Sequence, residues 1–298
     1  MHVLVMFFVP LFHGVCNMLE GHLSKYSIKS LYSMVFFSMV THIVGAAFLA
    51  ILLGIPPLPG TSTLMIIFAA AVICIFLHFP FFIAYRYIDT STVGAFLSLG
   101  KISTPILAFL ILGEQVSALQ YIGFGVIILA SVALGWDGKS KLKINAGLLF
   151  MLATSALASM ESIALRSASG TDWFTVAFWF IIFQATLPFF LLFIKQARTD
   201  ILATLPQYKS LLPYFLIITF FGLLGTFARV YALSELPVVV ASAINSIRPI
   251  LVLGMGMLAV RIFPISQINE KTSSKQITKK LLCFTFIIIG TWITIGLF

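Results

Sequence analysis

Charged residues are scarce in this chain: Asp, Glu, Lys and Arg together make up 9 % of its 298 residues, whereas hydrophobic residues make up 60 %. The mean hydropathy is +1.11. A soluble domain carries about 25 % charged residues, so the composition excludes an ordinary soluble protein. The formal net charge is +9, but the basic residues lie in short segments between apolar runs, where they orient a membrane protein. We therefore expect a multi-pass membrane protein whose partner is the lipid bilayer, with no role in nucleic-acid binding.

Cysteine is also scarce, and the common catalytic motifs are absent from the sequence. Cys16, Cys74 and Cys283 each fall in an apolar run without a CxxC pair or a histidine at metal-ligand spacing, which argues against a disulfide framework or a zinc site. The sequence contains no HExxH, H-x4-D, GxSxG or paired-Asp motif. We therefore expect neither an enzyme nor a bound metal or cofactor. The N-terminus lacks a basic region and an A-x-A site, so its first apolar segment is predicted to remain as a spanning helix.

Long apolar runs are what the chain has in abundance. About 20 apolar residues cross a hydrocarbon layer of ~30 Å, and ten runs qualify: 3–24, 31–53, 63–85, 90–112, 117–136, 145–166, 173–194, 211–233, 237–260 and 280–298. Polar residues gather only in 137–143, 195–209 and 261–280, which are predicted to be loops. The expected fold is an all-α integral membrane protein with ten transmembrane helices.

The two halves of the chain resemble each other. Pairs of identical or similar residues coincide at an offset of 144 residues: Ala84/Ala228, Tyr87/Tyr231, Thr90/Ser234, Ser98/Ser242 and Pro105/Pro249. Glu20 coincides with Glu161 at an offset of 141. Because each half has five spans, an odd number, the second half must enter the membrane in the opposite sense. We predict two inverted five-helix repeats, residues 1–136 and 145–298, joined by a linker at 137–144.

Two cations lie at the centres of predicted spans. Lys101 is the twelfth residue of span 90–112, and Arg248 is the twelfth residue of span 237–260. Each lies about 16 Å from the nearer end of its helix at 1.5 Å per residue, and an unpartnered charge at that depth costs roughly 2.5–3.5 kcal/mol. Each side chain therefore needs a partner or a cavity. One interpretation is an internal ion pair with Glu20 or Glu161. The other is recognition of an anionic substrate, for which arginine offers a bidentate contact and lysine a point charge.

Further polar residues share the helical faces of these cations or lie inside other spans. At spacings of three residues, the two faces consist of Ser98, Lys101 and Thr104 and of Ser242, Asn245 and Arg248. Tyr87 and Tyr231 are further candidates for substrate binding, and Asn17, Tyr85 and Gln184 are candidates for a polar lining.

Several titratable residues are candidates for gating or proton coupling. Glu20 and Glu161, each five residues before a basic residue, are predicted either to lie solvated at the interface or to act in gating or proton transfer. His13, His42 and His78 are interpreted either as histidines that hydrogen-bond within the bundle or as proton-coupling groups.

The segment 84–133 resembles the EamA-type domains of the ten-helix branch of the drug/metabolite transporter superfamily. The residues that carry this resemblance are Tyr87 and Thr90, Pro105, Gly113-Glu114, Gln120 and Gly123. The second half departs from the pattern, because no Gly-Glu pair follows span 237–260 and Glu270 is the nearest substitute. The resemblance implies a central cavity lined by spans one to four and six to nine. It also implies transport of metabolites by alternating access, without a cofactor.

The sequence thus favours a secondary transporter or facilitator of a small carboxylate-bearing or zwitterionic metabolite. The alternative is a proton-coupled exporter of cationic or drug-like compounds that uses Glu20 or Glu161. The bacterial inner membrane is the expected location. Fourteen Lys and Arg residues fall in alternate connections, against at most Arg166 and Arg229 in the others, which predicts external termini, whereas the resemblance implies cytoplasmic ones. No pattern specifies an oligomeric state.

Overall fold

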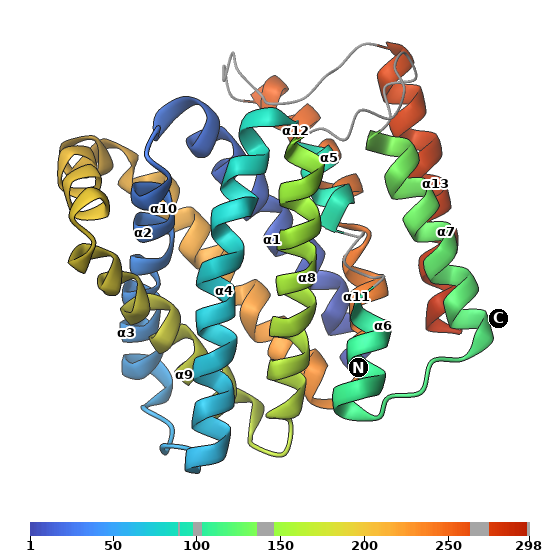
Figure 1. Cartoon of the computed structure of the whole chain (residues 1–298), viewed down its shortest axis with the longest axis horizontal. Helices are drawn as coiled ribbons and strands as arrows, with labels where there is room; N and C mark the ends of the chain where they lie inside the picture. The colour runs from blue at the N-terminus through green and yellow to red at the C-terminus, as the bar shows by residue number, and fades with distance from the viewer. Residues whose placement is uncertain (89, 98–102, 136–145, 263–273, 297–298) are drawn as a thin grey trace.

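The computed structural model describes residues 1–88, 90–97, 103–135, 146–262 and 274–296. These residues form a bundle of helices (Figure 1) without any strand among them. The helices are α1 (His2–His22), α2 (Leu31–Val40), α3 (His42–Leu53), α4 (Thr61–Tyr87), α5 (Thr90–Phe96), α6 (Ser103–Leu107), α7 (Ala118–Gly135), α8 (Ala146–Ser167), α9 (Trp173–Thr186), α10 (Lys195–Glu235), α11 (Val238–Asn245), α12 (Arg248–Ile262) and α13 (Ser274–Ile295). Short π-helical turns, Leu23–Ser27 and Ala108–Leu112, extend α1 and α6, and a 3₁₀ segment, Leu187–Phe193, extends α9.

The all-α membrane fold is confirmed. In the described part of the chain, eight helical segments are long and apolar enough to cross a membrane. Two further apolar helices, Ser103–Leu112 and Ala118–Leu134, lie in the predicted spans 90–112 and 117–136 but are shorter. In the residues that the structure describes, each predicted apolar run is therefore mainly helical, while the count of ten spans is approximate.

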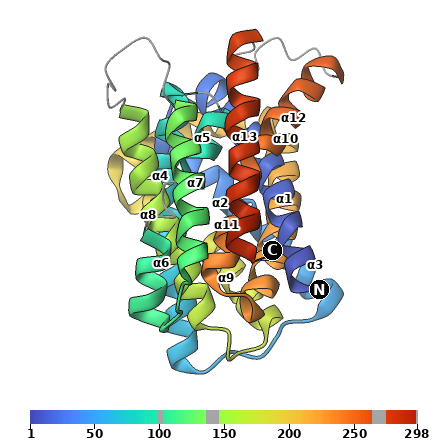
Figure 2. The same cartoon turned by 90° about the vertical axis from the view of Figure 1, so that its right-hand side faces the viewer.

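Both ends of the described chain lie on the same side of the bundle (Figures 1 and 2). The first half ends with α7 at Gly135, and the second half begins with α8 at Ala146. The predicted linker at 137–144 falls outside the described residues. We call the side that carries both ends the terminus face.

The predicted loop at 195–209 is wrong, because this segment is the first part of the 41-residue helix α10. Ala197 and Ile201 are buried, and the ring of Tyr208 stacks on Phe37 of α2 at 4.2 Å between centroids. The polar residues of the segment occupy the other side of the same helix. Polar content alone suggested a loop, whereas the spacing of the apolar residues decides for an amphipathic helix.

Two of the predicted spans are interrupted helices. Span 237–260 divides into α11 and α12 at Ser246 and Ile247. Pro249 contributes to this break, since it has no N–H to donate to the carbonyl of Asn245 four residues earlier. Span 90–112 is represented by α5 and α6, between which residues 98–102 are not described. The interrupted helices pack along each other, α5 against α12 and α6 against α11, as the matching polar faces of the two spans predicted.

The helices α7 and α13 form a closely packed pair (Figure 2). A Cβ atom added at Gly123 would lie 2.6 Å from the carbonyl oxygen of Gly290 and would also meet Thr294. Glycine is therefore required at this crossing.

We expect Gly123→Ala to destabilise the protein by about 1–3 kcal/mol, because the added methyl group forces two backbones apart. Gly125→Ala is the matched control, since a Cβ at Gly125 meets nothing within 4 Å. Thermal unfolding of the purified protein in detergent measures both effects. Equal melting temperatures for the two variants would show that the close crossing does not limit stability.

Candidate functional site

The helices surround a central cavity of about 180 Å³. Its walls come from both halves of the chain, chiefly from α1, α4, α8, α10, α11 and α12, and no residue of α7 or α13 lines it. At a liquid volume of about 30 Å³ per water molecule, the cavity holds roughly six waters or one small solute. Most of the predicted site residues meet here: His13, Glu20, His42, His78, Thr104, Glu161, Ser242, Asn245 and Arg248.

Arg248 lies at the break between the two halves of an interrupted helix, as the first residue of α12. Its Nη2 donates to Oδ1 of Asn245 at 2.8 Å and contacts Nδ1 of His13 at 3.2 Å. An arginine cannot accept a hydrogen bond, so His13 must present an unprotonated Nδ1. The buried Nε of Arg248 has no hydrogen-bond partner among the described residues. The guanidinium is thus held from one side and retains donor capacity at the cavity wall.

The ion pair that was one interpretation of Arg248 is not observed with any described residue. Instead, Glu161 of α8 pairs with Arg229 of α10, with 2.7 Å between Oε1 and Nη2. Sequence reasoning counted Arg229 only among the loop bases and missed it as a cavity residue. The repeat held a signal, because the offset of 144 places Arg229 on Tyr85, which is fully buried in α4.

Glu20 of α1 is buried in the cavity wall, with 6 % of its surface exposed. Its carboxylate makes no hydrogen bond or ion pair with any residue that the structure describes. The interfacial, solvated interpretation of Glu20 and Glu161 is therefore wrong, since both carboxylates are buried. The two glutamates are not equivalent: both line the cavity, but only Glu161 pairs with an arginine among the described residues.

The three candidate histidines differ in their partners. Nδ1 of His42 lies 3.1 Å from the carbonyl oxygens of Ser38 and Met39, and Nδ1 of His78 lies close to the carbonyl oxygen of Cys74. His42, the first residue of α3, thus hydrogen-bonds the end of α2, and His78 hydrogen-bonds its own helix α4. Both side chains are bonded within the bundle, as one of the two interpretations predicted. Only His13 reaches a charged side chain, that of Arg248.

The remaining candidates lie elsewhere. Tyr87 is 56 % exposed and stacks on Phe150, while Tyr231 stacks on His2 and packs edge-on against Trp173. Neither tyrosine is among the residues that line the described cavity, so the structure does not bring them to the candidate site. Ser98 and Lys101 lie outside the described residues.

Other polar side chains complete the wall. Thr104 of α6 shares a hydrogen bond of 2.8 Å with Ser159 of α8, which joins the two halves. Gln184 donates to the thiol of Cys74 at 2.9 Å, while its Oε1 and the Nδ2 of Asn17 are buried without a hydrogen-bond partner among the described residues. Buried polar atoms of this kind normally bind water or a ligand. The described residues contain no cluster of three or more His, Cys, Asp or Glu side chains suited to a metal ion.

Known proteins share the fold of this chain and part of its sequence pattern. A crystal structure described only as that of a protein superposes with a TM-score of 0.65 over 99 % of this chain and 96 % of that one, at 14 % sequence identity, and so shares the fold. No curated protein matches the sequence. Residues 2–136 match the sequence model of the EamA-like transporter family. This match covers the part of the chain that forms α1 to α7 and contributes His13, Glu20 and Thr104 to the cavity wall, so the first half is similar to the EamA-like transporter family.

Proposed function

We propose that the protein is a secondary transporter or facilitator, rather than an enzyme, and that it moves a small carboxylate-bearing or zwitterionic metabolite by alternating access. The cavity between the halves is the proposed binding site. Its volume of about 180 Å³ lies below the ~300 Å³ at which pockets for drug-sized ligands begin. Among solutes, metabolites of amino-acid size fit best.

The observation that carries this proposal is the buried, unpartnered Nε of Arg248 at a helix break. The break also places the first residue of α12 at the cavity wall, where the positive end of the helix dipole favours an anion. A carboxylate at this point would receive charge-assisted hydrogen bonds. A ligand-stabilisation screen of the purified protein against a metabolite library, followed by uptake into proteoliposomes, tests the proposal. Stabilisation by cationic or apolar compounds alone would contradict it.

Glu20 supplies a second pole for a zwitterionic substrate. Its carboxylate lines the same cavity and lacks a partner among the described residues, so an ammonium group would compensate its charge. The alternative function, proton-coupled export of cationic compounds, relies on the same observation. In that case transport would depend on a pH gradient and would not need Arg248.

We expect Glu20→Gln to weaken transport of an amino acid about 10-fold, since it removes a charge-assisted contact worth about 1.5–3 kcal/mol. Transport of the matching carboxylate without the amino group should change little. Competition between the two compounds in proteoliposomes measures the difference, and Glu235→Gln, on the exposed end of α10, is the control. Equal losses for both compounds would speak against an ammonium site at Glu20.

For orientation, we propose that the terminus face is external, in the inner membrane of a bacterium. The two basic residues assigned to that face by the sequence are both engaged, Arg166 with Glu114 and Arg229 with Glu161. The remaining loop bases therefore mark the opposite face as cytoplasmic. A reporter fused to the C-terminus that is active only in the cytoplasm should be inactive, and an active reporter would reverse the assignment.

A further inference from the structure

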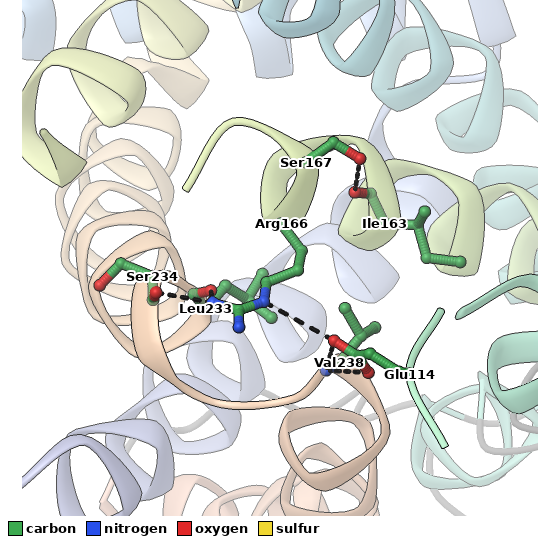
Figure 3. Close-up of polar contacts among 7 residues, drawn as sticks. All are labelled: Glu114, Ile163, Arg166, Ser167, Leu233, Ser234 and Val238. Atoms are coloured by element: carbon green, nitrogen blue, oxygen red, sulfur yellow. Dashed lines mark hydrogen bonds and ion pairs between the residues drawn. The ribbon is translucent and has the colours of Figure 1, made fainter. Parts of the chain in front are cut away.

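A polar cluster on the terminus face ties the two halves together (Figure 3). Glu114 follows the helical turn Ala108–Leu112 of the first half, and both of its carboxylate oxygens accept from the backbone N–H of Val238, at 3.2 and 3.0 Å. Glu114 therefore caps the start of α11, a helix of the second half. Its Oε1 also lies 3.6 Å from Nε of Arg166.

Arg166 connects this carboxylate to a third segment. From the last turn of α8, its Nη1 donates to the carbonyl oxygens of Leu233 and Ser234 at 2.8 and 2.6 Å. These carbonyls belong to the last turn of α10, just before the chain enters α11. Glu114 and Arg166 thus hold the α10–α11 turn from both of its ends. We name Glu114, Arg166, Leu233, Ser234 and Val238 the terminus-side latch.

The latch adjoins the cavity directly, since the side chains of Leu233 and Val238 line the cavity wall. A path from the cavity to the terminus face past these residues requires the α10–α11 turn to move away from α8. That movement breaks the contacts of Arg166 with the two carbonyls and of Glu114 with Val238. Closure of the cavity and integrity of the latch are therefore coupled by geometry.

The two ion pairs of the described chain are suited to different tasks. Glu114 and Arg166 retain 14 % and 24 % of their side-chain exposure, so water can solvate both charges when they separate. Partly exposed pairs are worth about 1 kcal/mol or less and therefore open readily. Glu161 is only 3 % exposed, so its separation from Arg229 would strand a charge in the bundle. Only the first pair can open and close in every cycle.

We propose that the terminus-side latch is the gate that seals the cavity on the terminus face, and that its opening is a step of the transport cycle. This rests on the proposed transport function, since a protein without alternating access has no need of a gate. The latch joins the halves asymmetrically, because no Gly-Glu pair follows span 237–260.

The chain contains its own reporters for this gate. Cys16 and Cys74 line the cavity, whereas Cys283 is buried between α7 and α13. The protein is placed in sealed proteoliposomes, and a small, charged methanethiosulfonate is added on the side of the terminus face. In the wild-type protein this reagent should label the two cavity thiols slowly. We expect Glu114→Gln and Arg166→Gln to accelerate this labelling about 5-fold, the equivalent of about 1 kcal/mol. Peptide mapping identifies the labelled cysteine.

Asp172 offers a matched control on the same face, because it accepts from the backbone N–H of Thr175 at the start of α9 and has no part in the latch. In the Asp172→Asn variant, the two cavity cysteines should be labelled at the wild-type rate. If neither Glu114→Gln nor Arg166→Gln exceeds that rate, the latch is not a gate. This measurement needs no transported substrate, so its outcome is independent of whether the proposed substrate class is right.

A cross-link provides a second test, because it holds the latch closed instead of removing its contacts. Glu114→Cys and Arg166→Cys, with the three native cysteines replaced by serine, can be joined by a short, reducible bis-methanethiosulfonate. The linked protein should lose transport and regain it on reduction. Undiminished transport in a fully linked sample would overturn the proposal, and so would a loss that reduction does not reverse.

Discussion

Replacing Arg248 with alanine is expected to slow transport of an anionic or zwitterionic substrate by about 30-fold or more. Truncation of one partner of a buried, charged contact costs about 2–5 kcal/mol, and every 1.4 kcal/mol corresponds to about a tenfold change. The loss should be large because Arg248 is the cation of the described cavity wall that has no carboxylate partner, and its Nε is already desolvated without a hydrogen bond. Initial rates of uptake into proteoliposomes give the effect.

Two companion variants separate charge from geometry. Arg248→Lys retains the positive charge but cannot contact Asn245, His13 and a carboxylate at once, so an intermediate rate is expected. Arg198→Ala removes an exposed arginine of α10 and should leave the rate unchanged. Wild-type transport by Arg248→Ala would refute the role that we assign to this residue. It would also favour the proton-coupled alternative, in which Glu20 carries the function.

Replacing Glu161 with alanine is expected to reduce the free energy of unfolding by about 3–5 kcal/mol, because it leaves the Arg229 guanidinium buried without its counter-charge. The pair is short, at 2.7 Å, and only 16 % and 3 % of the two side chains are exposed. Thermal or detergent-induced unfolding of the purified protein measures the change.

The double variant Glu161→Leu with Arg229→Met provides the decisive comparison. Exchange of a whole buried ion pair for apolar side chains of similar size is often neutral or stabilising, so most of the loss should be recovered. Glu20→Gln should hardly change the free energy of unfolding. No described residue pairs with the Glu20 carboxylate, so the substitution leaves no buried charge without its partner. If Glu161→Ala and Glu20→Gln unfold at the same temperature, the two glutamates are equivalent after all, contrary to the structure.

Some helical segments could be predicted from the sequence, and others could not. The apolar runs were long enough to identify as helices, because crossing a bilayer imposes a length and a composition that few other structures share. Segment 195–209 was misjudged, since an amphipathic helix and a polar loop have similar composition. The break at Ser246 and Ile247 could be foreseen in part from Pro249. The structure fixed its position, and Arg248 therefore lies at a helix start instead of within a continuous helix.

Helical spacing predicted which polar residues share one face of a helix, and this part of the cavity wall could be foreseen from the sequence. The face of Ser242, Asn245 and Arg248 does line the cavity, together with Thr104 from the matching face of the other half. The offset of 144 relates positions in the two halves without stating which side of the helix meets the cavity. Tyr87 and Tyr231 coincide in the repeat, but Tyr87 is largely exposed beside Phe150, and Tyr231 packs against Trp173.

The sequence by itself determined that this is an all-α membrane protein, that its halves resemble each other, and that Arg248 needs a partner or a cavity. These conclusions depend on composition and on spacing along one helix, which are local properties. Only the tertiary structure decided that Glu161 is neutralised by Arg229, that Glu20 is not neutralised by any described residue, and that Glu114 joins Arg166 and Val238 in a latch between the halves. The partner of a charge depends on which helices pack side by side, and those contacts connect residues as far apart in the chain as His13 and Arg248, which are separated by 235 positions.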